Sequence, residues 1–126
     1  VIHVSNTVID TKGLTYAIKK GIKDSFKNLK IKQKNTEVLL DGGLRAPDGF
    51  IQKTIIKGDE KEKIIAWASI LAKVSRDSLM FKIAKKYPEY DLEIHKGYGT
   101  VKHRKAIQKY GVSRVHRLSF CKLIFI

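Results

Sequence analysis

The stretch Val38-Leu39-Leu40-Asp41-Gly42-Gly43 is the point from which the organisation of this sequence can be worked out. Consecutive apolar residues of this kind are typical of a short strand buried on both faces, and the two glycines end it. Asp41 therefore stands at the carboxyl end of a buried strand, where open α/β sheets bind their ligands. Because a buried carboxylate is costly without a partner, we favour a functional role for Asp41 over a structural one.

On the N-terminal side of this strand, the pattern predicts another strand followed by a helix. Residues 1–8 are β-branched and apolar, which favours a strand. Asp10 is a candidate N-cap for a helix over residues 11–30, whose apolar residues recur at nearly every fourth position. A helix of that length could serve as a right-handed crossover between two parallel strands, at residues 1–8 and 38–41.

On the C-terminal side, residues 52–56 predict a second short strand, and residues 60–86 predict a long helix. The middle of that helix, residues 64–74, is apolar on most sides, so we expect it to lie in the core. Thr100 is expected to cap a last helix over residues 101–110. This order of strands and helices predicts an α/β chain.

The composition is that of a globular domain with a strongly basic surface. The chain has 126 residues, which suits one compact domain, and 26 Lys and Arg against 12 acidic residues give a formal net charge of +14. A domain this basic usually binds a polyanion, so nucleic acid is the favoured partner and a membrane surface the second choice. The alternative is that the lysines merely solvate helix faces. No apolar stretch approaches the roughly 18–20 residues of a membrane span.

The single cysteine and the four histidines limit the metal chemistry that the sequence predicts. Cys121 alone forms neither an internal disulfide nor a zinc site of several cysteines, and it fits a reducing, cytoplasmic setting. His3, His95, His103 and His116 are scattered, and their spacing matches no metal-binding pattern. We therefore expect each histidine to be a surface or hydrogen-bonding residue.

Asp59 has two interpretations. It stands at the expected start of the long helix, where aspartate is a favoured N-cap. Alternatively, Asp41 and Asp59 come together and bind a divalent cation, in which case their oxygen ligands favour Mg²⁺ or Mn²⁺ over zinc. Asp77 is a weaker candidate, because it follows Lys73 by four residues and a surface ion pair between the two would explain it.

Tyr98 is flanked by glycines, which predicts an exposed ring able to stack on a sugar or a base. The alternative is a turn tyrosine that anchors its loop to the core. Lys96 adds charge where a phosphate could lie. Lys73 and Arg76 could also contact backbone phosphates, or they could form a solvated helix face.

Six segments that follow one another along the chain resemble the motifs of prokaryotic ribonuclease HII. The resemblance is collinear and covers nearly the whole chain. Its most specific part is the Lys-Gly-Asp helix start combined with the Ala-Ser-Ile-Leu-Ala-Lys-Val run. The segments are Val38-Leu39-Leu40-Asp41-Gly42, Ile56-Lys57-Gly58-Asp59, residues 68–77, Tyr87-Pro88, residues 95–100 and residues 111–120.

This resemblance implies a ribonuclease H-like fold, with a mixed sheet flanked by helices. It implies an endonuclease that hydrolyses the RNA strand of RNA–DNA hybrids and cuts at single ribonucleotides embedded in DNA, by two-metal-ion catalysis with Mg²⁺ or Mn²⁺. Asp41 and Asp59 match two of the family's four metal-binding carboxylates. Tyr98 matches the tyrosine that senses the RNA–DNA junction.

The family's other two carboxylates form an Asp-Glu pair at the end of its first strand, and that motif is not found here. We therefore expect an N-terminally truncated chain that lacks its first strand and is inactive alone. Residues 1–90 would be the remainder of the core, and residues 91–126 a C-terminal helix and substrate-binding tail. The alternative is a non-catalytic basic remnant that binds nucleic acid. We expect a monomer without membrane contact.

Trp67 is a departure from the family pattern, which usually has a small residue in that run. We expect its ring to repack the core near Asp59.

Overall fold

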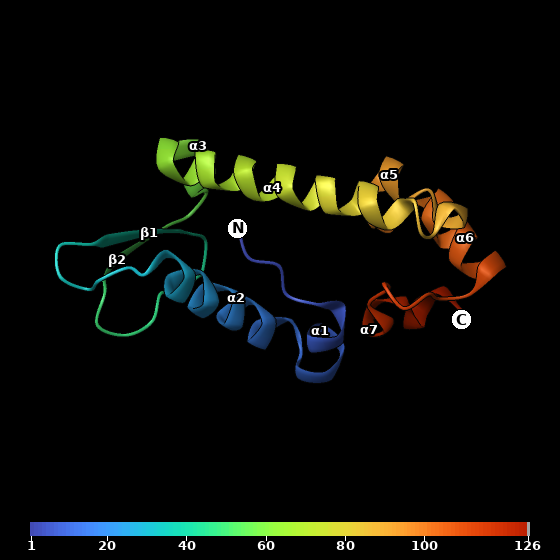
Figure 1. Ribbon diagram of the computed structural model, residues 1–126, viewed down its shortest axis with the longest axis horizontal. Helices are drawn as coiled ribbons and strands as arrows, with labels where there is room; N and C mark the ends of the chain where they lie inside the picture. Colours follow the sequence, from blue (N-terminus) through green and yellow to red (C-terminus); the bar gives the residue numbers. More distant parts are fainter. Residues whose placement is uncertain (126) are drawn as a thin grey trace. The chain divides into compact units, whose positions relative to one another are not determined.

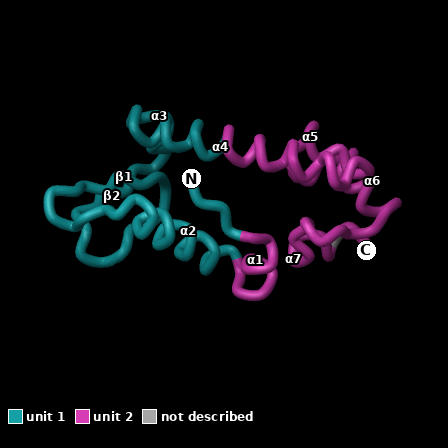
Figure 2. Tube along the Cα trace, in the orientation of Figure 1, with its two compact units in different colours: residues 1–4, 14–73 teal, residues 5–13, 74–126 magenta. Residues whose placement is uncertain are grey.

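The computed structural model of the chain describes residues 1–125 (Figure 1). It contains helices and a two-stranded parallel sheet, which confirms the predicted α/β class. The chain divides into two compact units (Figure 2). Unit 1 consists of residues 1–4 and 14–73, and unit 2 consists of residues 5–13 and the chain from Val74 onward.

Unit 1 is built around strands β1 (Glu37–Asp41) and β2 (Ile51–Ile55). The strands pair in parallel, from Glu37 opposite Ile51 to Asp41 opposite Ile55. Both predicted strands are therefore confirmed to within a residue. A loop without a helix joins them, and helix α2 (Leu14–Leu29) packs on that loop through Phe26 and Phe50, whose ring centroids are 4.7 Å apart.

The predicted strand at residues 1–8 is wrong. Residues 1–5 have no regular structure, and helix α1 (Asn6–Lys12) follows them. The Ser5 hydroxyl starts this helix by accepting a hydrogen bond of 3.4 Å from the backbone N–H of Val8. A side-chain cap of this kind satisfies a free helix N–H, and here it outweighs the β propensity of the apolar residues. The proposed crossover between two strands is wrong for the same reason.

The predicted helix over residues 11–30 is in fact two helices, α1 and α2, separated by Gly13. The backbone of Gly13 has a φ of +82°, a conformation that glycine adopts without strain and that ends α1. Asp10 lies inside α1 and is not an N-cap for it. Its carboxylate instead accepts hydrogen bonds of 2.9 Å from the backbone N–H groups of Leu118 and Ser119.

The long helix predicted for residues 60–86 is observed as α3 (Gly58–Lys61) and α4 (Lys63–Ala84). They are separated by Glu62, whose backbone is extended, with a φ of −123°, while its N–H still bonds to the carbonyl of Gly58 at 2.8 Å. The helix ends before Pro88, as predicted, because the residue before a proline disfavours helical backbone.

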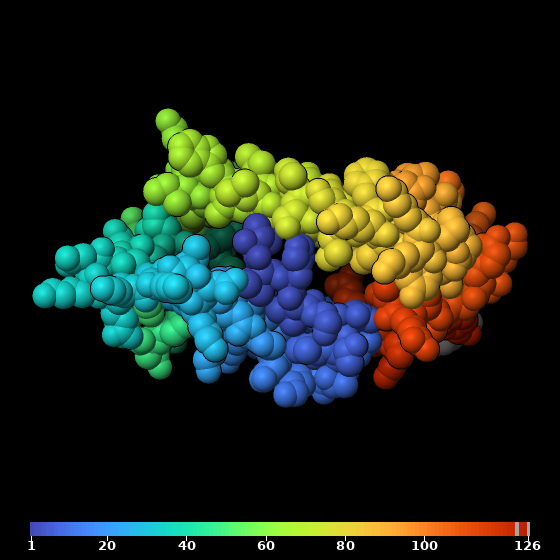
Figure 3. Space-filling model, viewed as in Figure 1, coloured from blue at the N-terminus to red at the C-terminus, as the bar shows by residue number. Residues whose placement is uncertain are grey.

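The expectation that residues 64–74 lie in the core is wrong. Ile65 is buried, but the apolar side chains around it are exposed, with Trp67 and Leu71 each 65% accessible. The atoms of α4, green to yellow, stand at the surface in Figure 3. This part of the helix carries apolar side chains on most of its sides, so burying all of them would need packing partners on several sides. Among residues 64–74, only Ile65 is buried by such partners. Trp67 therefore does not repack the core near Asp59.

Unit 2 has its own small core around Tyr90, Leu92 and Ile107, which are all at most 3% accessible. The elements that surround it are the second part of α4, η1 (Pro88–Tyr90), α5 (Leu92–His95), α6 (Val101–Tyr110), α7 (Leu118–Cys121) and η2 (Lys122–Ile124). Thr100 caps α6 as predicted, since its hydroxyl accepts a hydrogen bond from the N–H of His103. No helix in the described part of the chain is long and apolar enough to span a bilayer.

Candidate functional site

The carboxylate of Asp41 is fixed at the start of helix α3. After β2 the chain turns through Lys57, whose φ of 55° lies in the left-handed region, and this turn places the N–H of Gly58 2.8 Å from Asp41 Oδ1. A Cβ at Gly58 would lie 3.4 Å from that oxygen and 2.6 Å from Ile65 Cδ1. The absence of a side chain at Gly58 therefore permits the close approach between strand and helix.

Asp59 directly follows the residue that binds Asp41. It lies inside the first turn of α3, so of its two interpretations the N-cap one does not hold: the cap position is Lys57, and no side chain bonds there. Its carboxylate is exposed. The fold thus places the two predicted aspartates on adjoining segments, Asp41 bonded to Gly58 and Asp59 one residue further on.

Asp41 and Asp59 supply the type of donor atom that a hard divalent cation prefers, but two carboxylates are too few to hold it. Carboxylate oxygens are the ligands that Mg²⁺ and Mn²⁺ prefer. Asp41 uses Oδ1 to accept from Gly58. However, the described residues contain no group of three or more His, Cys, Asp or Glu side chains able to hold a metal. The residues present do not complete a metal site.

Arg76 joins two of the predicted residues within unit 2. Its Nε and Nη2 donate to Asp77 Oδ1 at 2.9 and 2.7 Å, and its Nη1 donates to the Tyr98 hydroxyl at 2.6 Å. The ion pair and the hydrogen bond raise the pKa of the guanidinium. The predicted ion pair between Asp77 and Lys73 is wrong, because the forked guanidinium of the adjacent residue reaches the carboxylate.

The ring of Tyr98 is 60% exposed, as the stacking hypothesis requires, and it is not buried as a core anchor would be. The Arg76 guanidinium lies 5.1 Å from the ring centroid. What is anchored is the backbone of the loop: the Tyr98 N–H donates to the carbonyl of His95 at 2.9 Å, and the Tyr98 carbonyl accepts from Thr100 at 2.8 Å.

The two predicted phosphate-binding lysines differ in their surroundings. Lys96 is half-buried, its ammonium donates to the carbonyl of Glu93, and it lies 4.2 Å from the ring centroid of Phe81. Lys73 is exposed on α4. A role of either lysine in binding phosphate stays a prediction.

Sequence reasoning missed a cluster of three histidines in unit 2. His95, His103 and His116 are 5–7% accessible, and their rings stack or bond to one another. Of the two roles expected for each of them, surface residue or hydrogen-bonding residue, the second is confirmed, and the three rings are buried. Their spacing gave no signal, because the residues come from the end of α5, the first turn of α6 and the chain after it.

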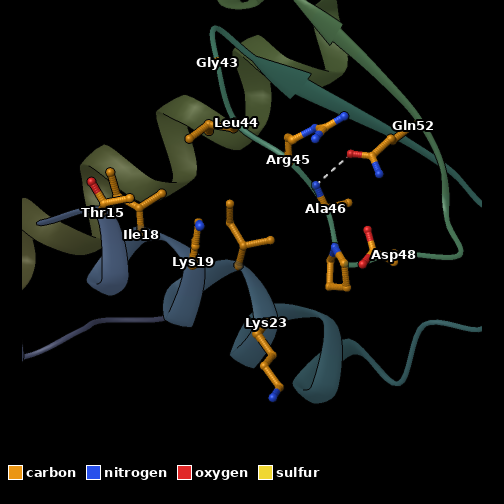
Figure 4. A pocket seen from close by; sticks show the side chains of 12 residues that line it. Thr15, Ile18, Lys19, Lys23, Gly43, Leu44, Arg45, Ala46, Asp48 and Gln52 are labelled. Carbon is orange, nitrogen blue, oxygen red and sulfur yellow. Dashed lines mark hydrogen bonds between the residues drawn. The ribbon is translucent and has the colours of Figure 1, made fainter. Parts of the chain in front are cut away.

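Unit 1 also contains an open pocket of about 670 Å³ between α2 and the loop after β1 (Figure 4). Lys19 and Lys23 of α2 and Arg45 of the loop line it. The loop is held by a hydrogen bond of 2.9 Å from the N–H of Ala46 to the side chain of Gln52. No pattern in the sequence predicted this pocket.

Comparison with known proteins identifies the family of this chain. The family model described as ribonuclease HII matches residues 2–123. The ribonuclease HII of Caldicellulosiruptor bescii is 46% identical over 125 residues, which cover 98% of this chain and 59% of the relative. That of Clostridium beijerinckii is 50% identical over 116 residues, which cover 92% of this chain and 42% of the relative.

The chain therefore spans about half the length of the curated relatives that it matches. The match nevertheless includes both aspartates, the Tyr98 loop and the histidine cluster, since all of them lie within residues 2–123. The chain belongs to the ribonuclease HII family.

Proposed function

We propose that this chain forms part of an endonuclease that hydrolyses the RNA strand of RNA–DNA hybrids and cuts at ribonucleotides embedded in DNA. The observation that carries the proposal is the bond between Asp41 and Gly58, which brings the strand-end carboxylate beside the helix turn that carries Asp59. Family membership supports it, as do relatives that are themselves named ribonuclease HII.

Asp41 and Asp59 are the residues that would act as ligands to a divalent cation, with Mg²⁺ and Mn²⁺ as the candidates. Bound cations of this kind activate water and stabilise the leaving oxygen in phosphate hydrolysis. Two carboxylates leave such a site incomplete, so further carboxylates are needed for cleavage. For the 126-residue polypeptide itself we therefore propose binding without cleavage.

The substrate-binding part of the proposal rests on charge and on Tyr98. The net charge of +14 favours a polyanion, and Lys73, Lys96 and Arg76 would contact phosphates without reading the sequence. The exposed Tyr98 ring offers a stacking surface for a sugar or base, and contacts to the 2′-hydroxyl would distinguish RNA from DNA. We expect the chain to bind as a monomer.

The alternative function is a nucleic-acid-binding module without catalysis. It is favoured by one observation, the absence of a third carboxylate beside Asp41 and Asp59 among the described residues. The two functions are separated by whether the same residues cut once a complete carboxylate set is present.

The test uses a labelled DNA duplex with one embedded ribonucleotide. The 126-residue chain should bind it, lose it as salt rises, bind it equally well in EDTA and leave it uncut in Mg²⁺ or Mn²⁺. A chain fused to the N-terminal segment of the Caldicellulosiruptor bescii relative should cut it, and Asp41→Asn in that fusion should not. A fusion that folds and binds but does not cut would favour the binding module. Robust cutting by the 126-residue chain would contradict the incomplete site and direct attention to Asp48, Glu60 and Asp77.

A further inference from the structure

The hydrogen bonds of the histidine cluster assign the proton on each ring. His95 Nε2 lies 2.7 Å from the carbonyl oxygen of Tyr90, which only accepts, so Nε2 carries a proton. Its Nδ1 accepts from the N–H of Gly97 at 3.3 Å and so has none. His95 is therefore a neutral imidazole with its proton on Nε2.

The other two rings are assigned in the same way. His103 Nδ1 faces the carbonyl of Tyr98 at 2.9 Å and must donate to it. His116 Nδ1 lies 3.0 Å from the N–H of Ser113 and 2.8 Å from its hydroxyl, so it accepts. His116 Nε2 then carries a proton and donates it to His103 Nε2, 3.1 Å away. His103 has the opposite tautomer from the other two rings.

The hydrogen bonds of the histidine cluster extend to the loop that carries Tyr98. His103 holds the Tyr98 carbonyl, and His95 holds the N–H of Gly97 with its ring and the N–H of Tyr98 with its own carbonyl. The rings of His95 and His103 are stacked, with centroids 4.2 Å apart. The exposed side chain of Tyr98 is therefore carried by a backbone that His95 and His103 hold at Gly97 and at both polar groups of Tyr98.

An additional proton on any ring would break one of these bonds. On His103 it would face the Nε2–H of His116, on His116 the N–H of Ser113, and on His95 the N–H of Gly97. Burial disfavours the charged form of both His103 and His116 and lowers the pKa of each. Glu89 acts on His116 in the opposite direction without reversing the shift.

We propose that His95, His103 and His116 are positioning residues, a neutral hydrogen-bonded relay that fixes the Tyr98 loop for binding to a ribonucleotide–DNA junction. The choice of a ribonucleotide–DNA junction as the ligand rests on the proposed function, whereas the fixed tautomers and the ordering of the loop do not. None of the three rings touches the substrate in this proposal, and His103 acts through Tyr98.

The first test is independent of substrate and uses the unaltered 126-residue chain. Nuclear magnetic resonance of ¹⁵N-labelled histidine at pH 7.5 should show protons on Nε2 of His95 and His116 and on Nδ1 of His103. Observation of an imidazolium in the cluster, or of the Nε2–H tautomer at His103, would overturn the proposal. This measurement needs no variant to fold.

The second test compares two replacements of His103. In His103→Asn the amide nitrogen can take the place of Nδ1 and still donate to Tyr98, while in His103→Gln the amide reaches only the position of Nε2. Exchange of the Tyr98 amide hydrogen should be about tenfold faster in His103→Gln than in His103→Asn, because the Tyr98 carbonyl then loses one of its two hydrogen-bond donors and the loop is held less firmly. Equal exchange rates in the two folded variants would contradict positioning by His103.

The third test connects the relay to binding. His103→Gln should weaken binding to a duplex with one embedded ribonucleotide by about tenfold, and should have no further effect in a Tyr98→Ala background, because residues that act together are not additive. An equal loss in both backgrounds would show that His103 does not act through Tyr98. If Tyr98→Ala leaves binding unchanged, the proposed function of Tyr98 fails, while the tautomers and exchange rates still decide the positioning role.

Discussion

The Arg76 guanidinium is shared between Asp77 and Tyr98, with hydrogen bonds of 2.7 Å to the carboxylate and 2.6 Å to the phenol. Arg76 and Asp77 are neighbours on α4, whereas Tyr98 lies on the loop before α6, 22 residues further along the chain than Arg76. The bond therefore restrains the end of an otherwise exposed side chain. It also occupies one N–H of an arginine that was predicted to contact phosphate.

This relationship predicts different effects for two substitutions of Tyr98. Tyr98→Ala removes the ring and should weaken stacking by about 1–3 kcal/mol, whereas Tyr98→Phe keeps the ring and loses only the bond to Arg76. Binding should be measured with a single embedded ribonucleotide and with a long hybrid, where many other contacts contribute. Tyr98→Ala should impair binding to the first substrate more. An equal loss on both substrates would indicate a purely structural tyrosine.

Asp41→Asn should separate folding from catalysis. The amide oxygen of asparagine can still accept from the N–H of Gly58, so the melting temperature should hardly change. In the fused chain described above, cleavage should fall by several orders of magnitude, because a neutral amide is a poor ligand for a hard cation. Asp59→Asn serves as the matched variant, with the same two measurements. Near-normal cleavage by either variant would exclude that residue as a metal ligand.

Gly58→Ala should destabilise unit 1 through crowding. The new Cβ would lie 2.6 Å from Ile65 Cδ1, and overpacking of this kind costs about 1–3 kcal/mol, here nearer the lower figure because the contact is the tip of a side chain. Gly43→Ala is the control, since a Cβ there meets nothing within 4 Å. Urea unfolding measures both. Adding Ile65→Val, which removes Cδ1, should restore part of the loss, and no recovery would contradict this steric explanation.

The buried histidines predict that stability depends on pH. The pKa values of His103 and His116 lie below the ordinary 6.5, mainly because of burial. Below about pH 6.5 the unfolded chain binds protons that the folded chain does not, so the free energy of unfolding should fall as the pH falls, and it should be flat just above pH 7. Urea unfolding between pH 5 and 8 checks this. Stability that rises on acidification through this range would contradict it.

The elements that the sequence predicted correctly are those with strong local signals. Strands at residues 38–41 and 52–56 are bounded by glycine or turn residues, and Thr100 caps α6 as expected. The predicted strand at residues 1–8 failed because one serine hydroxyl starts a helix there. Apolar periodicity indicates which side chains prefer burial, and it does not show whether a neighbour covers them, as the exposed half of α4 demonstrates.

The residues of the candidate site also fall into those that local sequence pattern predicts and those that depend on tertiary packing. Asp41 could be selected from its place at a strand end, because that position follows from local pattern and sheet geometry. The ion-pair partner of Asp77 depends on which basic side chain reaches its carboxylate. The i, i+4 spacing predicted Lys73, whereas the structure shows the adjacent Arg76. The histidine cluster is a product of tertiary packing between α5, α6 and the following chain, so no spacing rule could have found it.

The exposed position of Trp67 gives this chain a built-in optical reporter. It is the only tryptophan in the sequence and is 65% accessible, so its emission should be red-shifted and readily quenched by acrylamide or iodide. Any molecule or segment that covers this part of α4 would shift the emission to shorter wavelengths and shield the indole. Fluorescence of the unlabelled chain can therefore follow, in real time, whether this part of α4 stays exposed to solvent.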